Sequence, residues 1–192
     1  KTAGFAIGGA NPSAPATYDT IDRFTFTAPS TVTDAGEFTA TGLTSGAHQG
    51  SGSSTNGTYG FVFGGYFPSP GATVDQQTKL AFSAPYPMSD NGELSAISDN
   101  CFGHSDTTFS YRSGGYPLVD VIERFPFAAT SGTYSDVGNL IAPTSQGGSA
   151  SGPTHGITHG GSPPYTDTLH RFEFASSGDA TDIGEATQAG NS

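Results

Sequence analysis

The sequence has no tryptophan, one cysteine, one methionine and only six lysines and arginines in 192 residues. The single Cys101 excludes an internal disulfide framework and the cysteine-rich zinc patterns, and we expect it to fill apolar space. A net charge of −11 argues against nucleic-acid binding, which needs a basic face, and against electrostatic binding to anionic lipid. No apolar run approaches the roughly 20 residues that span a bilayer, so we expect no membrane insertion.

Glycine and aromatic residues are abundant instead, with 28 glycines, 14 phenylalanines and 8 tyrosines. Charged residues make up only 12% of the chain, yet this aromatic content argues against disorder. No window shows a convincing apolar period of 3.6, and glycine or proline interrupts every candidate helix. The composition therefore predicts an all-β protein of short strands joined by tight turns.

Three sequence marks recur four times in the same order. A strand-like segment ending in Gly-Gly occurs at 4–9, 60–65, 110–115 and 156–161. An alternating segment follows at 18–26, 74–82, 119–127 and 166–174. An Asp-x-Gly mark comes next, at Asp34, Asp90, Asp136 and Asp182. The repeat predicts a single domain of four units, approximately 1–47, 48–103, 104–147 and 148–192.

Each unit is expected to hold four antiparallel strands, a to d. Strand a is the Ser/Gly-rich run, for example 48–55, and strand b ends in Gly-Gly. Strand c carries a pair of large apolar residues, and strand d follows Asp-x-Gly. Asn56-Gly57 predicts a hairpin between strands a and b of the second unit. The first unit begins at strand b and lacks strand a.

Strand c also carries charges at two repeated positions. A basic residue always precedes the apolar pair, at Arg23, Lys79, Arg124 and Arg171. An aspartate always lies four residues earlier, at Asp19, Asp75, Asp120 and Asp167. About 13 Å separates the two positions along one strand, so we expect each basic group to reach an acidic group on a neighbouring strand or unit. Both sets are therefore interpreted as structural positions.

Four short strands repeated every 40–56 residues are typical of a β-propeller. The Gly-Gly that closes strand b and the alternating strand c resemble kelch repeats, although the usual strand-d tryptophan is absent. More closely, "PTHGITHGG" and "RFEFASSGDATDIGE" resemble kelch-like repeats of virion structural and tail-fibre proteins of marine tailed bacteriophages, notably cyanophages. That resemblance implies a location on the virion surface or outside the cell, and a role in adhesion.

Ring closure stays open at this point. Four blades could close imperfectly, a neighbouring chain could donate the missing strand a, or the units could belong to a larger propeller or assembly. An open stack of sheets forming a fibre is the further alternative.

Histidines and aspartates offer candidate metal ligands, but each has a simpler interpretation. On a strand, His155 and His159 lie about 13 Å apart, too far to share one zinc ion. His48 and His104 lie near strand a, where a structural or solvated role is expected. Asp-x-Gly is ordinary turn chemistry, which is favoured over a calcium site. We expect no metal and no cofactor.

No catalytic set is recognisable, so we expect no enzyme. Neither a G-x-S-x-G elbow nor a P-loop is present, and Cys101 with eight tyrosines does not establish the copper site of galactose oxidases. Binding is expected in the variable b–c loops, because loops on rigid scaffolds carry function. The candidate ligand-binding aromatics there are Tyr18, Tyr66, Phe67, Tyr116 and Tyr165, unless they pack beneath the loops.

Two functions fit these observations. The first is a non-catalytic attachment module of a phage tail or fibre, with a host surface glycan as candidate ligand. The alternative is a purely structural subunit, either a decoration protein or a protomer of an extracellular filament assembled through strand exchange. Both predict other virion or filament subunits as partners in an oligomeric assembly.

Overall fold

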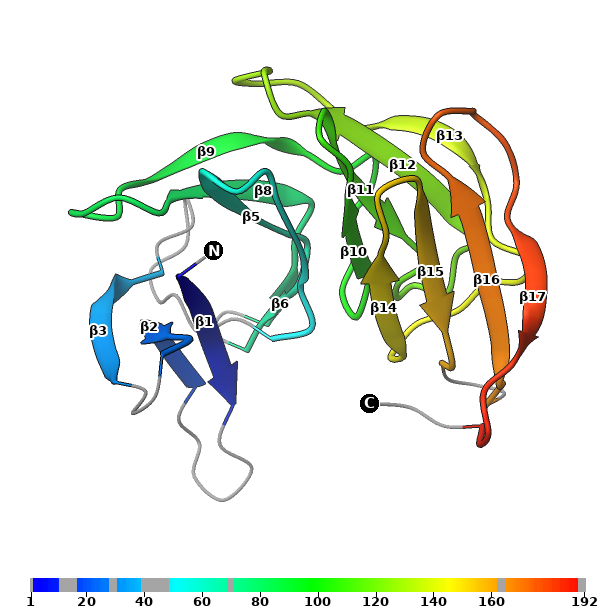
Figure 1. Cartoon of the computed structure of the whole chain (residues 1–192), viewed down its shortest axis with the longest axis horizontal. Helices are drawn as coiled ribbons and strands as arrows, with labels where there is room; N and C mark the ends of the chain where they lie inside the picture. The colour runs from blue at the N-terminus through cyan, green and yellow to red at the C-terminus, as the bar shows by residue number, and fades with distance from the viewer. Residues whose placement is uncertain are drawn as a thin grey trace.

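The computed structural model describes residues 2–10, 17–27, 31–38, 49–68, 71–161 and 165–189. All regular elements within these ranges are β-strands (Figure 1). They form three four-stranded sheets, one three-stranded sheet and a two-stranded ribbon, each with antiparallel neighbours. The all-β prediction is confirmed. Across the same ranges, no helix is long and apolar enough to cross a membrane.

The strands of each sheet follow one another in chain order. Sheet 1 contains β1 (Ala3–Ala10), β2 (Thr17–Thr25) and β3 (Val32–Glu37). Sheet 2 contains β4 (Gly52–Thr55), β5 (Tyr59–Phe63), β8 (Gln76–Ala81) and β9 (Met88–Glu93). Sheet 3 contains β10 (Phe102–Ser105), β11 (Phe109–Ser113), β12 (Val121–Pro126) and β13 (Ser135–Asn139). Sheet 4 contains β14 (Gly148–Ser151), β15 (His155–His159), β16 (Thr168–Glu173) and β17 (Thr181–Glu185). The ribbon pairs β6 (Tyr66–Phe67) with β7 (Ala72–Thr73).

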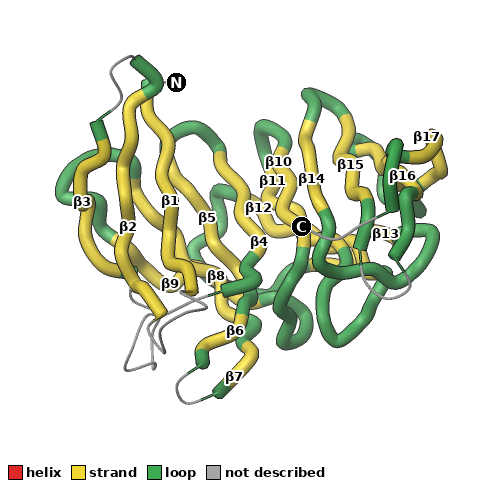
Figure 2. Tube along the Cα trace, turned by 90° about the horizontal axis from the view of Figure 1, so that it is seen from below, coloured by secondary structure: helices red, strands yellow, loops and turns green. Residues whose placement is uncertain are grey.

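The four sheets stand side by side in chain order (Figure 2). The strand-a elements β4, β10 and β14 lie together, since β10 contacts both of the others. Sheet 1 has no strand a among the described residues, and β1 pairs there only with β2. Sheets 1 and 4 lie at opposite ends of the array (Figure 1).

A glycine pair with positive φ directly follows strand b in sheets 2, 3 and 4, whereas in sheet 1 the pair Gly8-Gly9 lies inside β1 at a shift of register. The first glycine of each pair has φ between 56° and 70°, and the second between 105° and 141°. A side chain would be strained at either position. At Gly114 an added Cβ would also lie 2.4 Å from the Thr144 carbonyl oxygen.

The Asp-x-Gly marks form the predicted local hydrogen bond in all four units. Each aspartate carboxylate accepts the N–H of the glycine two residues later, at 2.8–3.2 Å. Their placement before strand d is wrong, however, because all four marks lie inside strand d. The pairing between strands c and d shifts register beside each mark, so the turn is a β-bulge that the strand accommodates.

Apolar side chains pack between consecutive sheets in three clusters. Ile21, Phe38 and Leu80 belong to the cluster between sheets 1 and 2. Phe63 and Phe125 belong to the cluster between sheets 2 and 3. Cys101 is buried in the same cluster, as expected of a residue that fills apolar space. The third cluster, between sheets 3 and 4, includes Tyr111, Leu140 and Phe172.

The repeated basic residues do not find the acidic partners that we expected. Among the described residues, none of the four basic groups lies within 4.0 Å of a carboxylate oxygen. Lys79 Nζ instead lies 4.0 Å from the ring centre of Tyr59, and the Arg124 guanidinium carbon lies 4.4 Å from that of Phe109. Both rings belong to the adjacent strand b, where a cation–π contact replaces the ion pair.

The repeated aspartates contribute through their backbone. The carbonyl oxygens of Asp19, Asp75, Asp120 and Asp167 each accept an N–H from the residue just after strand d, at 2.5–2.7 Å. These donors are Phe38, Leu94, Leu140 and Ala186. The bond ties the end of strand d to the start of strand c in every unit.

Candidate functional site

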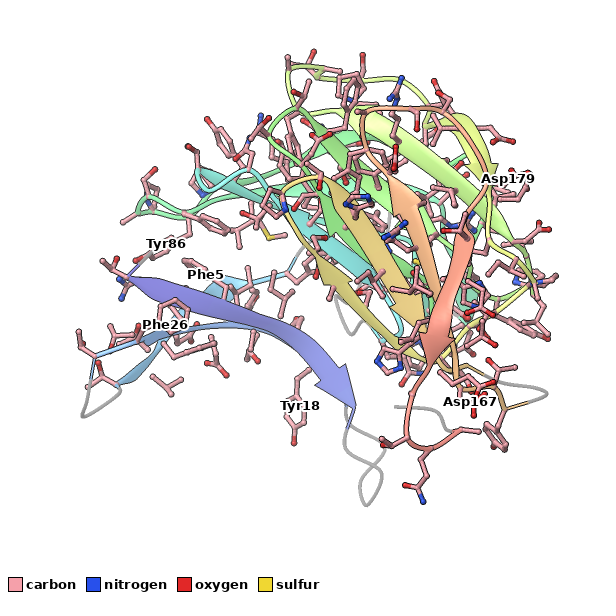
Figure 3. The ribbon with its side chains drawn as sticks, turned by 45° about the vertical axis from the view of Figure 1, so that its right-hand side comes forward. Phe5, Tyr18, Phe26, Tyr86, Asp167 and Asp179 are labelled. Atoms are coloured by element: carbon pink, nitrogen blue, oxygen red, sulfur yellow. The ribbon has the colours of Figure 1, made fainter. Side chains whose placement is uncertain are left out.

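Four tyrosines lie at equivalent places in the repeat, where a strand b ends and a strand c begins. Tyr18 lies near the start of β2, Tyr66 starts β6, Tyr116 follows the Gly-Gly after β11, and Tyr165 precedes β16. Tyr18, Tyr116 and Tyr165 are exposed and Tyr66 is half-buried. Figure 3 places Tyr18 and Asp167 toward one end of the molecule, and Phe26 and Tyr86 toward the other.

Backbone hydrogen bonds fix two of these tyrosines. Tyr66 exchanges N–H···O bonds with Gln49 at 2.8 and 3.1 Å, and Tyr116 does so with Asp99 at 2.7 and 2.9 Å. Each pair joins the end of one strand b to the segment that leads into a strand a. The rings therefore project from an ordered backbone.

Phe67 is not available as a ligand-binding aromatic, because its side chain is buried. It belongs to the cluster that contains Val62 and Leu80. Successive residues of a strand point to opposite faces, so Tyr66 reaches the surface while Phe67 packs beneath the ribbon. Much of the b–c loops at 10–17 and 162–165 lies outside the described residues, as does His48.

A cavity of about 500 Å³ lies between β1 and the strand-a elements β4 and β10. Phe5 and Phe82 line it and are stacked, with ring centres 4.8 Å apart and planes 7° apart. The exposed ring of Phe26 lines it too, and Ser53, Ser105 and Ser151 add hydroxyls. The cavity lies beside the edge of β1 that no strand of the described ranges covers, at the place that strand a occupies in sheets 2, 3 and 4.

His104 on β10 has a structural role. Its Nδ1 lies 3.2 Å from the Ala150 carbonyl oxygen, which can only accept, so Nδ1 carries the proton. Its Nε2 accepts from the hydroxyls of Ser113 and Thr158, each 3.0 Å away. Burial lowers the pKa of His104 from 6.5 to about 4. The ring is therefore neutral and links sheets 3 and 4.

His155 and His159 both lie on β15, between a turn at 152–154 and the Gly-Gly pair, as predicted. His155 Nε2 lies 3.5 Å from a Glu173 carboxylate oxygen on the adjacent strand. In the part of the chain that the structure describes, no three His, Cys, Asp or Glu side chains cluster in a way that could hold a metal ion.

A buried polar network at sheets 2 and 3 was not predicted. An Arg112 guanidinium nitrogen lies 3.6 Å from a Glu123 carboxylate oxygen, and both side chains are buried. The other Glu123 oxygen accepts the Ser95 N–H at 3.2 Å. Nearby, the Tyr134 hydroxyl donates to Gln77, and burial holds its pKa well above 10.

The sequence shows two charges at these repeat positions, but not that they pair. Arg112 and Glu123 occupy paired positions on strands b and c. The same pair is Val62 and Thr78 in sheet 2, which lacks the charges. The network joins sheets 2 and 3 and is closed to solvent, so it is not available to a ligand.

The comparisons with known proteins bear on the fold alone. No protein-family model and no curated protein matches the chain. Among the similar solved structures is that of YjhT, with a TM-score of 0.71 and 12% sequence identity. The match covers 96% of this chain and 66% of the length of YjhT. It supports the all-β arrangement of successive antiparallel sheets.

Proposed function

We propose that the chain is a non-catalytic attachment module, built of four kelch-like propeller blades of which the first lacks strand a. Four sheets with one strand order, and the fold similarity to YjhT, support the propeller. The presence of a tyrosine at the b–c end of all four units is the observation that carries the attachment role. The sequence resemblance to phage virion and tail-fibre repeats supports a location on a virion surface or outside the cell.

A host surface glycan is the ligand that these side chains suit best. A tyrosine presents a flat apolar face for a sugar ring and a hydroxyl for its oxygens, at low entropic cost. The net charge of −11 disfavours an anionic ligand. We therefore propose a neutral or cationic glycan, with Tyr18, Tyr66, Tyr116 and Tyr165 as contacts.

A glycan array followed by host-cell binding tests this proposal. Tyr116→Ala and Tyr165→Ala should each weaken binding at least tenfold, because removal of a central aromatic contact costs more than about 1.4 kcal/mol of binding free energy. Both rings are exposed, so unfolding midpoints should hardly change. Tyr86→Ala, toward the other end of the molecule, is the control for loss of a tyrosine ring and should bind normally (Figure 3). Because Tyr86 is half-buried and contacts the Phe5 ring, its unfolding midpoint is measured beside its binding. Equal binding by all three variants and the wild type would refute the assignment.

A structural subunit is the second candidate, and the uncovered edge of β1 favours it. In sheets 2, 3 and 4 the four residues of strand a pair with strand b, whereas β1 faces the 500 Å³ cavity. A strand donated by a neighbouring subunit would complete sheet 1 and fill this space. Hydrogen exchange tests the idea, because assembly by strand exchange should slow exchange in β1 far more than in β8 or β12.

A further inference from the structure

The three interfaces between sheets are built from the same repeat positions. We call the face of a sheet that packs on the following sheet its front, and the face that packs on the preceding sheet its back. A strand-b ring on the front packs against the aromatic residue that directly follows strand c of the next sheet. The pairs are Phe5 with Phe82 at 4.8 Å, Phe61 with Phe127 at 4.8 Å, and Tyr111 with Phe174 at 4.6 Å between ring centres.

The back face has a second repeated position at the start of strand d. Met88, Tyr134 and Ala180 occupy it in sheets 2, 3 and 4, and all three pack in inter-sheet clusters. The front face likewise has repeated positions on strand c and just after strand d. Ile21 and Ile122 occupy the first, and Phe38, Leu94 and Leu140 the second; all are at most 3% exposed.

Sheet 1 presents an uncovered back face. Phe26 and Val32 occupy the two repeated positions and are 59% and 64% exposed. Their equivalents in sheet 3, Phe127 and Tyr134, are 9% and 4% exposed. Among the described residues, no sheet packs on the back face of sheet 1, whereas sheets 1, 2 and 3 pack on the back faces of sheets 2, 3 and 4.

Among the described residues, no sheet packs on the front face of sheet 4. Ile157 replaces the stacking ring of β5 and β11, and Leu169 occupies the strand-c position; both are half-buried. Ile183, at the centre of the Asp-x-Gly bulge, is 41% exposed. Its equivalents Ala35 and Val137 pack in inter-sheet clusters.

From these two end faces we infer that copies of this chain associate head to tail, with the front of sheet 4 packing on the back of sheet 1 of a second copy. The contact continues the interfaces already present within the chain. Ile157 would meet Phe26 as Tyr111 meets Phe174, and Ile183 would add apolar cover as Val137 does. The two faces lie at opposite ends of the array, so one copy does not satisfy both (Figure 1). Because the faces differ, each copy offers one of each, and the contact can close a ring or extend a filament.

This inference does not rest on glycan binding, and it differs from strand exchange because it needs no new strand on β1. Apolar faces of this kind on monomeric proteins mark interaction sites. The preferred partner is a second copy because both halves of the contact belong to the same repeat pattern.

Light scattering after size exclusion, with Phe26→Asp and Ile183→Asp, tests the inference. Wild-type mass should rise above the monomer with concentration, and each variant should weaken association at least tenfold. An equimolar mixture should recover a heterodimer, because Ile183→Asp keeps an intact back face and Phe26→Asp an intact front face. Val32→Asp is a second back-face variant, in case Phe26→Asp perturbs the cavity.

Ile97→Asp is the matched control, since Ile97 is 52% exposed and belongs to neither end face. It should associate like the wild type, and all variants should keep wild-type circular dichroism. A wild type that stays monomeric at its highest soluble concentration would overturn the inference. Association that resists both end-face variants, or a mixture that stays monomeric, would overturn it as well.

Discussion

Among single residues, the bulge glycines of strand d have the same local conformation but different surroundings. Gly138 has φ of 152°, and an added Cβ would lie 2.2 Å from the Gly178 carbonyl oxygen of the next sheet. Gly184 has φ of 128°, and nothing lies within 4 Å of its added Cβ. The two positions therefore separate backbone strain from contact between sheets.

Gly138→Ala should lower the free energy of unfolding more than Gly184→Ala. Strain alone costs about 1 kcal/mol at either site, and overpacking against backbone adds about 1–3 kcal/mol at Gly138. Urea denaturation of the two variants measures the difference. Equal losses would show that sheet 4 moves aside without cost.

His104 predicts a loss of stability in acid. Its pKa is about 4 in the folded protein and about 6.5 in the unfolded chain, so the unfolded chain binds the extra proton between these values. The contribution of neutral His104 is complete above pH 6.5 and falls as the pH drops toward 4, by about 3 kcal/mol in all. His104→Gln should remove this dependence, so its stability deficit relative to wild type should shrink between pH 7 and pH 4. His170, whose pKa burial also lowers, titrates in both proteins and cancels.

The Arg112–Glu123 pair should show strong coupling. Glu123→Thr alone leaves a guanidinium buried without its carboxylate and should cost about 3–5 kcal/mol. Arg112→Val with Glu123→Thr copies the Val62 and Thr78 pair of sheet 2 and should cost less than Glu123→Thr alone. Thermal or urea unfolding of the singles and the double completes the cycle. Additive losses would contradict coupling.

Among the elements, sheet 1 is the least supported. In the part of the chain that the structure describes, it has three strands, no sheet packed on its back face, and a cavity beside β1. Under conditions where the protein is monomeric, amides of β2 and β3 should exchange faster than those of β12 and β13, because local opening there exposes fewer apolar contacts. Hydrogen exchange with mass spectrometry resolves these segments. Comparable protection would show that sheet 1 opens only with the whole fold.

The elements also show which parts of the structure the sequence can predict. Gly-Gly and Asp-x-Gly act on their own backbone, so the pattern predicts their local geometry. The Asp-x-Gly marks were wrongly placed before strand d, and the Gly-Gly pair of sheet 1 lies inside strand b and not at its end. The ring beneath Lys79 and the partner of Arg112 depend on strand register, which the repeat marks do not specify. The cavity and the burial of Phe67 depend on how neighbouring sheets meet, and composition carries no signal for that.

At the scale of the whole molecule, net charge and the apolar end faces have opposite effects on association between copies. Two copies of net charge −11 repel, while their end faces attract. Raising ionic strength from about 0.01 M to 0.15 M shortens the screening length from about 30 Å to about 8 Å, so association should strengthen. Sedimentation equilibrium at the two salt concentrations measures this. Association that weakens with salt would point to an ionic interface instead.

The repeated ring stacks have a consequence for how such a chain can change length. Sheets 2 and 3 each use the same two aromatic positions to contact the sheet before and the sheet after, so a copy of either unit inserted by recombination would bring both rings with it. Contacts that occur in one sheet only, such as the buried Arg112 and Glu123 pair, would still have to be accommodated in the copy. Insertion of a copied unit would change the length of the array and the number of variable b–c loops together.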